Sequence, residues 1–297
     1  MPTLSTVTAT GNLFPEVLVA DLISKVKGRS SLAVLSQQTP IPFNGSKEFV
    51  FSMDSEIDIV AENGKKTPGG LKLEPYIVRP IKVEYGARVS DEFLYASEEA
   101  RVSILQAFND GFAKKLAKGL DWMAMHGINP RTSTASEVIG TNHFDGKVTQ
   151  TAQFNAADPE AAIESAVALV QAAEGDVNGL IMSTVVSSAL AKIKVNGVKQ
   201  YPSLAWGANP GELNGLRAEV NNTVAKGDTD VALLGDFANG FKWGYAKEVI
   251  FDMIKYGDPD NTGKDLRGYN QVYLRAESFL GWSILLPEHF ARITKGA

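Results

Sequence analysis

The chain contains no cysteine and only three histidines among its 297 residues. Without cysteine it cannot form disulfides, use a catalytic thiolate or hold zinc or iron–sulfur clusters through thiolates. It also lacks an apolar run near the roughly 20 residues that span a bilayer, so no transmembrane helix is expected. The opening stretch MPTLSTVTATGN has neither the basic nor the apolar region of a secretory signal. We expect a globular or assembling protein made in the cytosol.

A basic excess is also missing. The 29 Lys and Arg residues against 34 Asp and Glu residues give a formal net charge of −5. Proteins that bind nucleic acid by bulk attraction normally carry a positive charge. That mode of binding is therefore not expected.

Motifs of common active sites are absent as well. The sequence has no Gly-rich phosphate loop, no dinucleotide fingerprint, no G-x-S-x-G and no H-E-x-x-H. His126, His143 and His289 lie far apart and lack metal-ligand spacing. Residues 258–265 resemble the start of a calcium loop, but Tyr269 stands where the loop requires a bidentate Glu. We expect no catalytic, cofactor or metal site, with a soluble enzyme of unrecognised site as an alternative.

Residues 47–86 show the strongest local pattern. Apolar residues alternate with polar ones up to Ile59 and again from Leu71 to Tyr85, the period of a β-strand. Residues 62–70 between them are dense in turn formers and include Asn63-Gly64. Arms of about fourteen residues would reach ~45 Å, beyond the ~20 Å radius of a compact chain of this length.

This pattern predicts a hairpin that projects from the body and buries its apolar face on another subunit, because a free one would aggregate. The predicted assembly contacts are Phe49, Phe51, Met53, Ile57, Ile59, Leu71, Leu73 and Ile77.

The rest of the chain predicts an α+β protein, one central domain with projecting parts. Ser90 is expected to cap a helix of roughly 55 Å that runs to about His126. Gly111 and Gly119 are expected to bend this helix or to let a neighbour approach. Further helices are expected at 15–28, 158–174 and 183–195, and strands at 179–183, 216–221, 230–237, 241–254 and 269–286. Residues 131–155 are expected to form loops.

This order of elements resembles the major capsid proteins of tailed double-stranded DNA bacteriophages, the Hong Kong 97-type fold family, a fold that encapsulin nanocompartments also use. Three phrases support the resemblance: LNGLRAEV at 213–220, LGDF at 234–237 and NQVYLRAE at 270–277. The first is similar to the family's L-x-G-x-P-V strand, with Arg217 or Ala218 in place of the usual proline.

The resemblance implies a division of the chain and a structural role. The implied parts are an N-terminal arm (1–29), the first part of a peripheral domain (30–130, with extended loop 47–86 and spine helix 90–126), an axial domain (131–246), peripheral return strands (247–284) and a C-terminal tail on the axial domain (285–297). Such a subunit would assemble through pentamers and hexamers into an icosahedral or prolate shell that encloses phage DNA.

The implied partners are further copies of the chain and scaffolding, portal and decoration proteins. Packaged DNA would be contacted weakly and non-specifically, and no membrane is involved. The protein would be made in the host bacterial cytoplasm and reside in the virion capsid. Because Met1 directly precedes the arm, we expect a separate scaffolding protein or none. An encapsulin-like shell around a cargo enzyme is the alternative.

A cross-linking member of this family joins a loop lysine to an asparagine amide on a neighbour, with a glutamate seven positions later accepting the proton. The matching residues here are Lys65 or Lys66, Asn270 and Glu277. Burial and a nearby carboxylate would be needed to activate the amine. Most members do not cross-link, so no catalysis is expected, and the alternative is that these residues serve packing and solvation.

Overall fold

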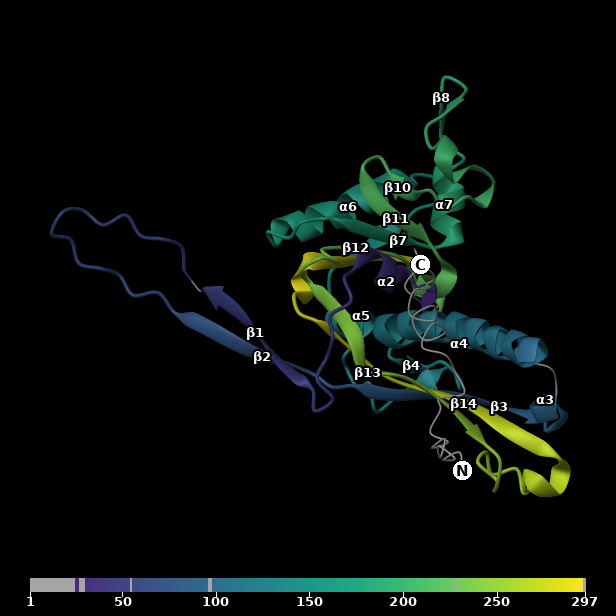
Figure 1. Cartoon of the computed structure of the whole chain (residues 1–297). Helices are drawn as coiled ribbons and strands as arrows, with labels where there is room; N and C mark the ends of the chain where they lie inside the picture. Colours follow the sequence, from purple (N-terminus) through teal and green to yellow (C-terminus); the bar gives the residue numbers. More distant parts are fainter. Residues whose placement is uncertain (1–24, 27–29, 54, 96–97, 228, 296–297) are drawn as a thin grey trace, which may run out of the picture.

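Two β-sheets and one long helix organise the chain, and a hairpin extends away from them (Figure 1). The computed structural model describes residues 25–26, 30–53, 55–95, 98–227 and 229–295. The predicted N-terminal arm and the helix at 15–28 therefore lie outside the described residues, except for Lys25 and Val26.

The first sheet has three antiparallel strands in the order β13-β14-β3. Their bounds are Phe241–Ile254 for β13, Gln271–Ile284 for β14 and Ile81–Ser90 for β3. The helix α4, Glu98–His126, packs on this sheet. The rings of Phe108 and Phe112 on α4 lie 6.4 and 6.2 Å from the ring of Phe251 on β13. These aromatic contacts fix the helix across the strands.

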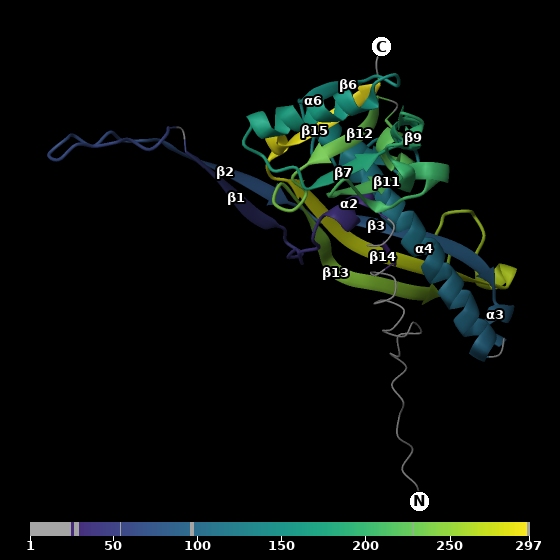
Figure 2. The same cartoon turned by 90° about the horizontal axis from the view of Figure 1, so that it is seen from above.

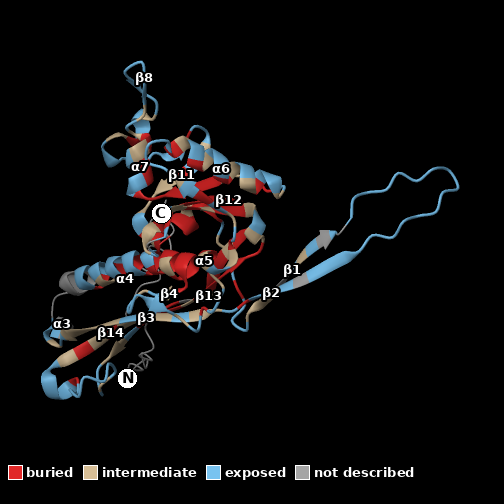
Figure 3. Cartoon of the chain, turned by 180° about the vertical axis from the view of Figure 1, so that it is seen from behind, coloured by how far each residue is buried: buried red, intermediate tan, exposed pale blue. Residues whose placement is uncertain are grey.

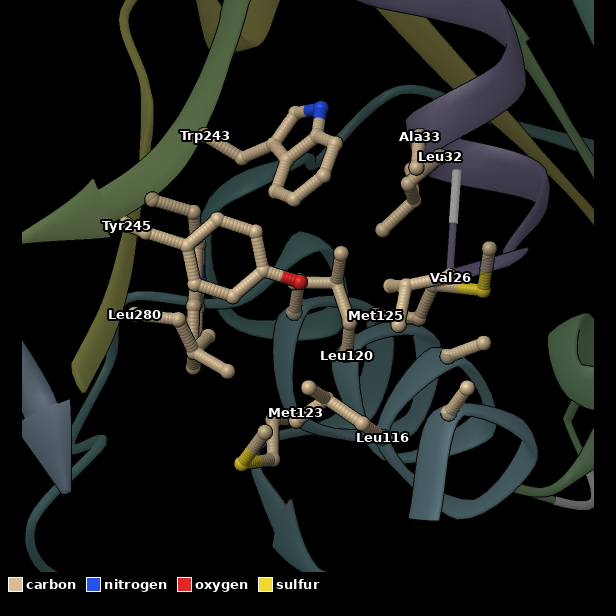
Figure 4. Close-up of a cluster of buried hydrophobic side chains, with 14 of the residues drawn as sticks. Val26, Leu32, Ala33, Leu116, Leu120, Met123, Met125, Trp243, Tyr245 and Leu280 are labelled. Carbon is tan, nitrogen blue, oxygen red and sulfur yellow. The ribbon is translucent and has the colours of Figure 1, made fainter. Parts of the chain in front are cut away.

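Behind α4 the same core continues to the short helix α2, Ser31–Leu35. Figure 4 shows Leu32 and Val26 facing Leu120 and Met125 of α4, with Trp243 of β13 alongside. All five side chains are at most 1% exposed. The segment after α2 runs beside β13, since the backbone N–H groups of residues 39 and 41 donate to the carbonyls of residues 243 and 245.

The second sheet has six strands in the order β10-β11-β7-β12-β15-β6 and is mixed, because β11–β7 and β15–β6 pair in parallel. The bounds are Gly211–Leu213, Leu216–Val220, Gly179–Met182, Asp230–Gly235, Phe290–Lys295 and Thr151–Phe154 in that order. Helices α6 (Pro159–Ala172) and α7 (Thr184–Leu190) accompany this sheet (Figure 2).

The predicted start of α6 is confirmed. Pro159 occupies the first turn, and the side chain of Asp158 accepts a hydrogen bond from the N–H of Ala161. The remaining described elements are β1 (Ser46–Met53), β2 (Leu71–Val78), α3 (Glu92–Tyr95), β4 (Ile128–Asn129), β5 (Thr134–Ala135), α5 (Phe144–Lys147), β8 (Lys194–Val195), β9 (Val198–Lys199) and the 3-10 helices η1 (Pro202–Gly207), η2 (Asn222–Ala225), η3 (Arg267–Tyr269) and η4 (Pro287–His289).

Several sequence expectations need correction. The second hairpin arm is two strands, because the ladder stops at residues 79–80, where Pro80 has no N–H to donate. The long helix α4 has 29 residues and is about 44 Å long, shorter than the expected 55 Å. Ser90 does not cap it, because the Ser90 hydroxyl accepts a hydrogen bond from the backbone N–H of Glu92 at the start of α3. Residues 131–155 were expected to form loops, but they contain strand β5, the short helix α5 and strand β6 of the second sheet. Residues 285–297 include β15, which pairs with β12 and β6 inside the second sheet, and their place as a tail on the axial domain stays a prediction.

Two buried polar clusters connect α4 to the rest of the body. The carboxylate of Asp121 accepts from the hydroxyls of Ser30 and Thr223 at 2.5 and 2.8 Å and is fully buried, which raises its pKa. At the end of α4, the imidazole of His126 contacts Asp145 at 2.8 Å and the carbonyl of Thr223 at 2.9 Å. Both ring nitrogens of His126 therefore contact partners within the chain.

Candidate assembly interface

The β1–β2 hairpin has one completely apolar face along its outer part. In the antiparallel register Phe49 is opposite Pro75, Phe51 is opposite Leu73, and Met53 is opposite Leu71. Residues that pair directly in an antiparallel ladder share a face. The alternation in the sequence therefore produces a two-stranded ribbon with apolar side chains gathered on one side.

Among the residues whose positions are described, nothing covers this apolar face. Phe51, Met53 and Leu71 are 65%, 81% and 61% exposed. The ribbon points away from both sheets in two perpendicular views, and Figure 3 shows it as almost entirely exposed. A contiguous apolar surface of this kind, with two open strand edges, marks a protein interaction site or an aggregation hazard.

The far end of the hairpin carries no β-ladder. Strand β1 ends at Met53 and β2 begins at Leu71, so the predicted strand over Ile57 and Ile59 is not formed, and these side chains are 95% and 96% exposed. The predicted turn at Asn63-Gly64 is confirmed, because Asn63 has a φ of 67° and the Gly64 N–H donates to a carbonyl three residues back. Residues 55–70 of this loop are all exposed with respect to the described part of the chain.

The base of the hairpin, by contrast, is held by the body. Val78 is buried, and the ammonium of Lys147 lies 5.1 Å from the centre of the Tyr76 ring. The rings of Phe43 and Phe279 meet edge to face with 5.1 Å between their centres. These anchors, which sequence reasoning did not single out, fix the direction in which the ribbon leaves the molecule.

The four cross-link candidates do not come together in one chain. Lys65 and Lys66 lie in the exposed loop at the hairpin end, whereas β14 begins at the opposite end of the molecule (Figure 1). Asn270 precedes β14 in a left-handed conformation with a φ of 51°. Glu277 lies inside β14, where its Oε1 is 2.8 Å from the ammonium of Lys82 and 3.2 Å from a guanidinium nitrogen of Arg275.

A second exposed apolar site lies far from the hairpin. Trp206 is 100% exposed in a left-handed backbone conformation, with the ammonium of Lys199 5.7 Å from its ring centre. Val195 and Val198, on the neighbouring β8–β9 turn, are also exposed. The Asn196-Gly197 dipeptide was the sequence signal that could have revealed this small hairpin.

The calcium-like loop is held by a cation of the protein itself. The guanidinium of Arg88 on β3 contacts Asp258 at 2.6 Å and Asp260 at 2.9 Å, and its hydrogen bond lowers the pKa of Asp260 to about 2. Across the residues with described positions, no three acidic or His side chains form a possible metal cluster, and no helix is long and apolar enough to cross a membrane.

Comparison with known proteins gives a consistent result. The model of the Phage capsid family matches residues 10–295. A chain from Mycobacterium phage Ogopogo is 28% identical, with 90% of this chain and 92% of that chain covered and a TM-score of 0.76. A chain from Gordonia phage Cozz is 23% identical, with coverages of 91% and 87% and a TM-score of 0.73. A chain described as the capsid of a native GTA particle is 14% identical, with coverages of 100% and 96% and a TM-score of 0.63. No curated protein sequence matches.

Proposed function

The chain belongs to the phage capsid family, and on that premise we propose that it assembles through pentamers and hexamers into an icosahedral or prolate shell around double-stranded DNA. Its role is structural and non-enzymatic, and its place is the virion capsid, where it associates with copies of itself. The observation that carries the finer proposal is the projecting ribbon, whose apolar face is exposed with respect to all described residues of the chain.

The division into Hong Kong 97-type domains is part of this proposal. The peripheral domain, residues 30–130 and 247–284, would contain α4 and the three-stranded sheet except for the first six residues of β13. The six-stranded sheet with α6 and α7 would form the axial domain, from residues 131–246 and 285–297. In support, each sheet has its own strands, and one of the two hydrophobic clusters lies wholly within residues 131–246 and 285–297. The larger cluster joins the two parts, since Ile181 and Leu233 of the second sheet belong to it together with residues of α4. Residues 1–29 would be the arm.

The ribbon would lie on a neighbouring subunit with its apolar face down. Fully burying one large apolar side chain stabilises by about 1.5–3 kcal/mol, so the predicted contact residues supply on the order of 10 kcal/mol. Association itself costs an estimated 4–15 kcal/mol. One hairpin contact is therefore near break-even, and a stable shell needs several contacts per subunit to form together.

The proposal extends to partners and to the place of synthesis. Scaffolding, portal and decoration proteins would contact the shell, packaged DNA would touch it weakly and non-specifically, and synthesis would take place in the host bacterial cytoplasm. An encapsulin-like compartment shares the fold class, and what co-purifies with the shell distinguishes the two functions.

The first test is the mass and shape of the purified full-length protein, by light scattering with negative-stain imaging. Closed shells of megadalton mass support the proposal, and capsomer rings or sheets support it with a scaffold missing. A cargo enzyme that co-purifies with the shells would show that the protein forms an encapsulin-like compartment and does not enclose a genome. A monomer or dimer that no salt, concentration or partner assembles would overturn both.

A further inference from the structure

A groove of about 460 Å³ lies between the middle of α4 and the segment that contains η2. Its described lining residues are Lys114, Lys118, Trp122, Asn221, Asn222, Thr223 and Lys226. The lining therefore brings together three lysines and, within the described part of the chain, no carboxylate. In a chain with a net charge of −5, this is a local concentration of positive charge.

The lysines converge from two sides of the groove. Lys114 and Lys118 are four positions apart on α4 and so share one helix face. Lys226 approaches from the end of η2. The ammonium groups of Lys118 and Lys226 lie 4.2 and 4.8 Å from the centre of the Trp122 ring, which holds both near one point.

Trp122 adds an unused hydrogen-bond donor. Its Nε1 is buried and has no hydrogen-bond partner among the described residues. A buried indole N–H normally finds an acceptor, and leaving it unpaired costs free energy. The groove thus combines three ammonium groups and one free N–H, a set of donors that suits an anionic acceptor.

The nearest acids are occupied elsewhere. Asp110, one turn before Lys114, pairs with Lys25 at 2.5 Å. Asp121, beside Trp122, is buried, does not line the groove, and accepts hydrogen bonds from Ser30 and from the lining residues Thr223 and Asn221. No ion pair joins the three groove lysines to a carboxylate whose position is described. Their charge is available to a ligand.

We propose that this groove binds phosphate groups of a nucleic-acid backbone. Lysine binds phosphate as a point charge without fixed geometry, and the groove has no arginine fork for the bidentate capture of carboxylates. Such contacts hold a polyanion without reading its sequence. The inference rests on the proposed function, because an enclosed genome is the polyanion that a shell subunit would meet.

The test measures binding of a fluorescent duplex DNA of about 20 base pairs to the full-length protein at several salt concentrations. The triple variant Lys114→Gln, Lys118→Gln, Lys226→Gln should lower the slope of log affinity against log salt by about one unit for each lysine. The matched control, Lys192→Gln, Lys194→Gln, Lys199→Gln, removes the same charge from exposed positions elsewhere and should keep the slope. A Lys→Arg triple variant should also keep it.

A local readout separates the groove from the rest of the surface. Because Trp206 is also exposed, fluorescence is measured in a Trp206→Phe background, where Trp243 and Trp282 are buried. DNA should change the fluorescence of that protein, and adding Trp122→Phe should abolish the change. Circular dichroism confirms that each variant is folded. Equal DNA binding and equal slopes in the wild type and the Gln variant would overturn the proposal.

Two other ligands are outcomes of the same experiment. Polyglutamate that displaces DNA at lower concentration, together with shells lost in the Gln variant, would assign the groove to an acidic protein segment and overturn the proposal. Inorganic phosphate that changes Trp122 fluorescence while DNA does not would assign it to free phosphate. If the wild type forms shells but the DNA slope is the same in the Gln variant, this inference fails alone. If DNA binds in the groove but the protein stays a monomer or dimer under every condition, the proposed function fails alone.

Discussion

Phe51 on β1 lies directly opposite Leu73 on β2, and the two side chains are 65% and 47% exposed. A directly opposed pair of this type stabilises a ladder by about 0.2–1 kcal/mol. This energy is small beside the stabilisation of about 1.5–3 kcal/mol that fully burying each of these apolar side chains would give. The described residues of the chain provide no surface that covers this pair, so the ribbon is suited to a contact with another subunit.

Phe51→Asp should prevent shell formation while the subunit stays folded. A charge at the centre of the apolar face must be desolvated in any contact, whereas at this exposed position it should change the free energy of unfolding by no more than about 0.5 kcal/mol. Light scattering measures assembly, and denaturant unfolding measures stability. The control Lys72→Asp changes the opposite face of the same ribbon. Wild-type yields of shells from Phe51→Asp would contradict the role of this face.

Deleting residues 61–70 should leave a folded subunit and impair shell formation or shell stability. All ten residues are exposed, and the β1–β2 ladder lies outside the deleted segment. Circular dichroism and negative-stain imaging of the deletion variant check the two parts of this expectation. Shells of normal number and stability would show that the end of the hairpin is dispensable.

Boiled, denatured shells should run as a single band at 31.9 kDa. A cross-link would require Lys65 or Lys66 to attack the side-chain amide of Asn270 with release of ammonia, and Glu277 to accept the proton. The carboxylate of Glu277 is already paired with Lys82 and Arg275 of its own chain. Ladders of higher mass that disappear in Asn270→Asp would refute this expectation.

Stability should fall as pH rises from about 5 to about 8. Burial and the neighbouring Asp145 raise the pKa of Asp230 from 3.8 to about 7, and contact with Asp145 raises the pKa of His126 above 6.5 despite its burial. A raised pKa means stabilisation that is complete below the unfolded value and is lost as pH passes the folded value. The loss should be on the order of 2 kcal/mol, since one pKa unit corresponds to about 1.4 kcal/mol.

Denaturant unfolding at a series of pH values measures this loss. Asp230→Asn should flatten the profile, because it removes the carboxyl group whose raised pKa causes most of the pH dependence. The control Asp252→Asn removes an exposed partner of Arg275 and should leave the profile unchanged. A wild-type profile that rises across this interval would contradict the assignment.

Two glycine substitutions should have opposite effects. A Cβ at Gly111 in α4 meets nothing within 4 Å, so Gly111→Ala should stabilise the unassembled subunit by about 0.5–1 kcal/mol. A Cβ at Gly244 in β13 would lie 1.7 Å from the carbonyl oxygen of Thr39, so Gly244→Ala should destabilise by about 3 kcal/mol or more. Thermal unfolding compares them, and similar melting temperatures would refute this account of the two positions.

The sequence predicted best those features that depend on local periodicity. The alternation from Phe49 onward identified the ribbon, and Asp158-Pro159 identified the start of α6. The same local reasoning wrongly predicted β2 and β3 as one arm, because the alternation of apolar and polar residues continues on both sides of Pro80. Periodicity reports which residues share a face, but it does not report which strand they pair with.

Features made by distant segments were not predictable in this way. Strand β6 has four residues and pairs only through β15, which begins more than a hundred residues later. The groove on α4 depends on Lys226 lying across from Lys118. The ion pairs of Arg88 with Asp258 and Asp260 likewise join separate parts of the chain. Non-local pairing of this kind leaves no spacing signal in one sequence.

The position of β15 inside the second sheet also determines the order in which the two parts of the chain can fold during translation. Because β15 lies between β12 and β6, the second sheet lacks a central member until residues 290–295 have left the ribosome. By that time β1 and β2, some 200 residues earlier, have long been able to pair. The apolar face of the β1–β2 ribbon is therefore exposed on the nascent chain before the second sheet can be completed. Several nascent chains on one polysome bring such ribbons close together, which favours aggregation. Chaperone protection during translation is therefore a need that this topology creates.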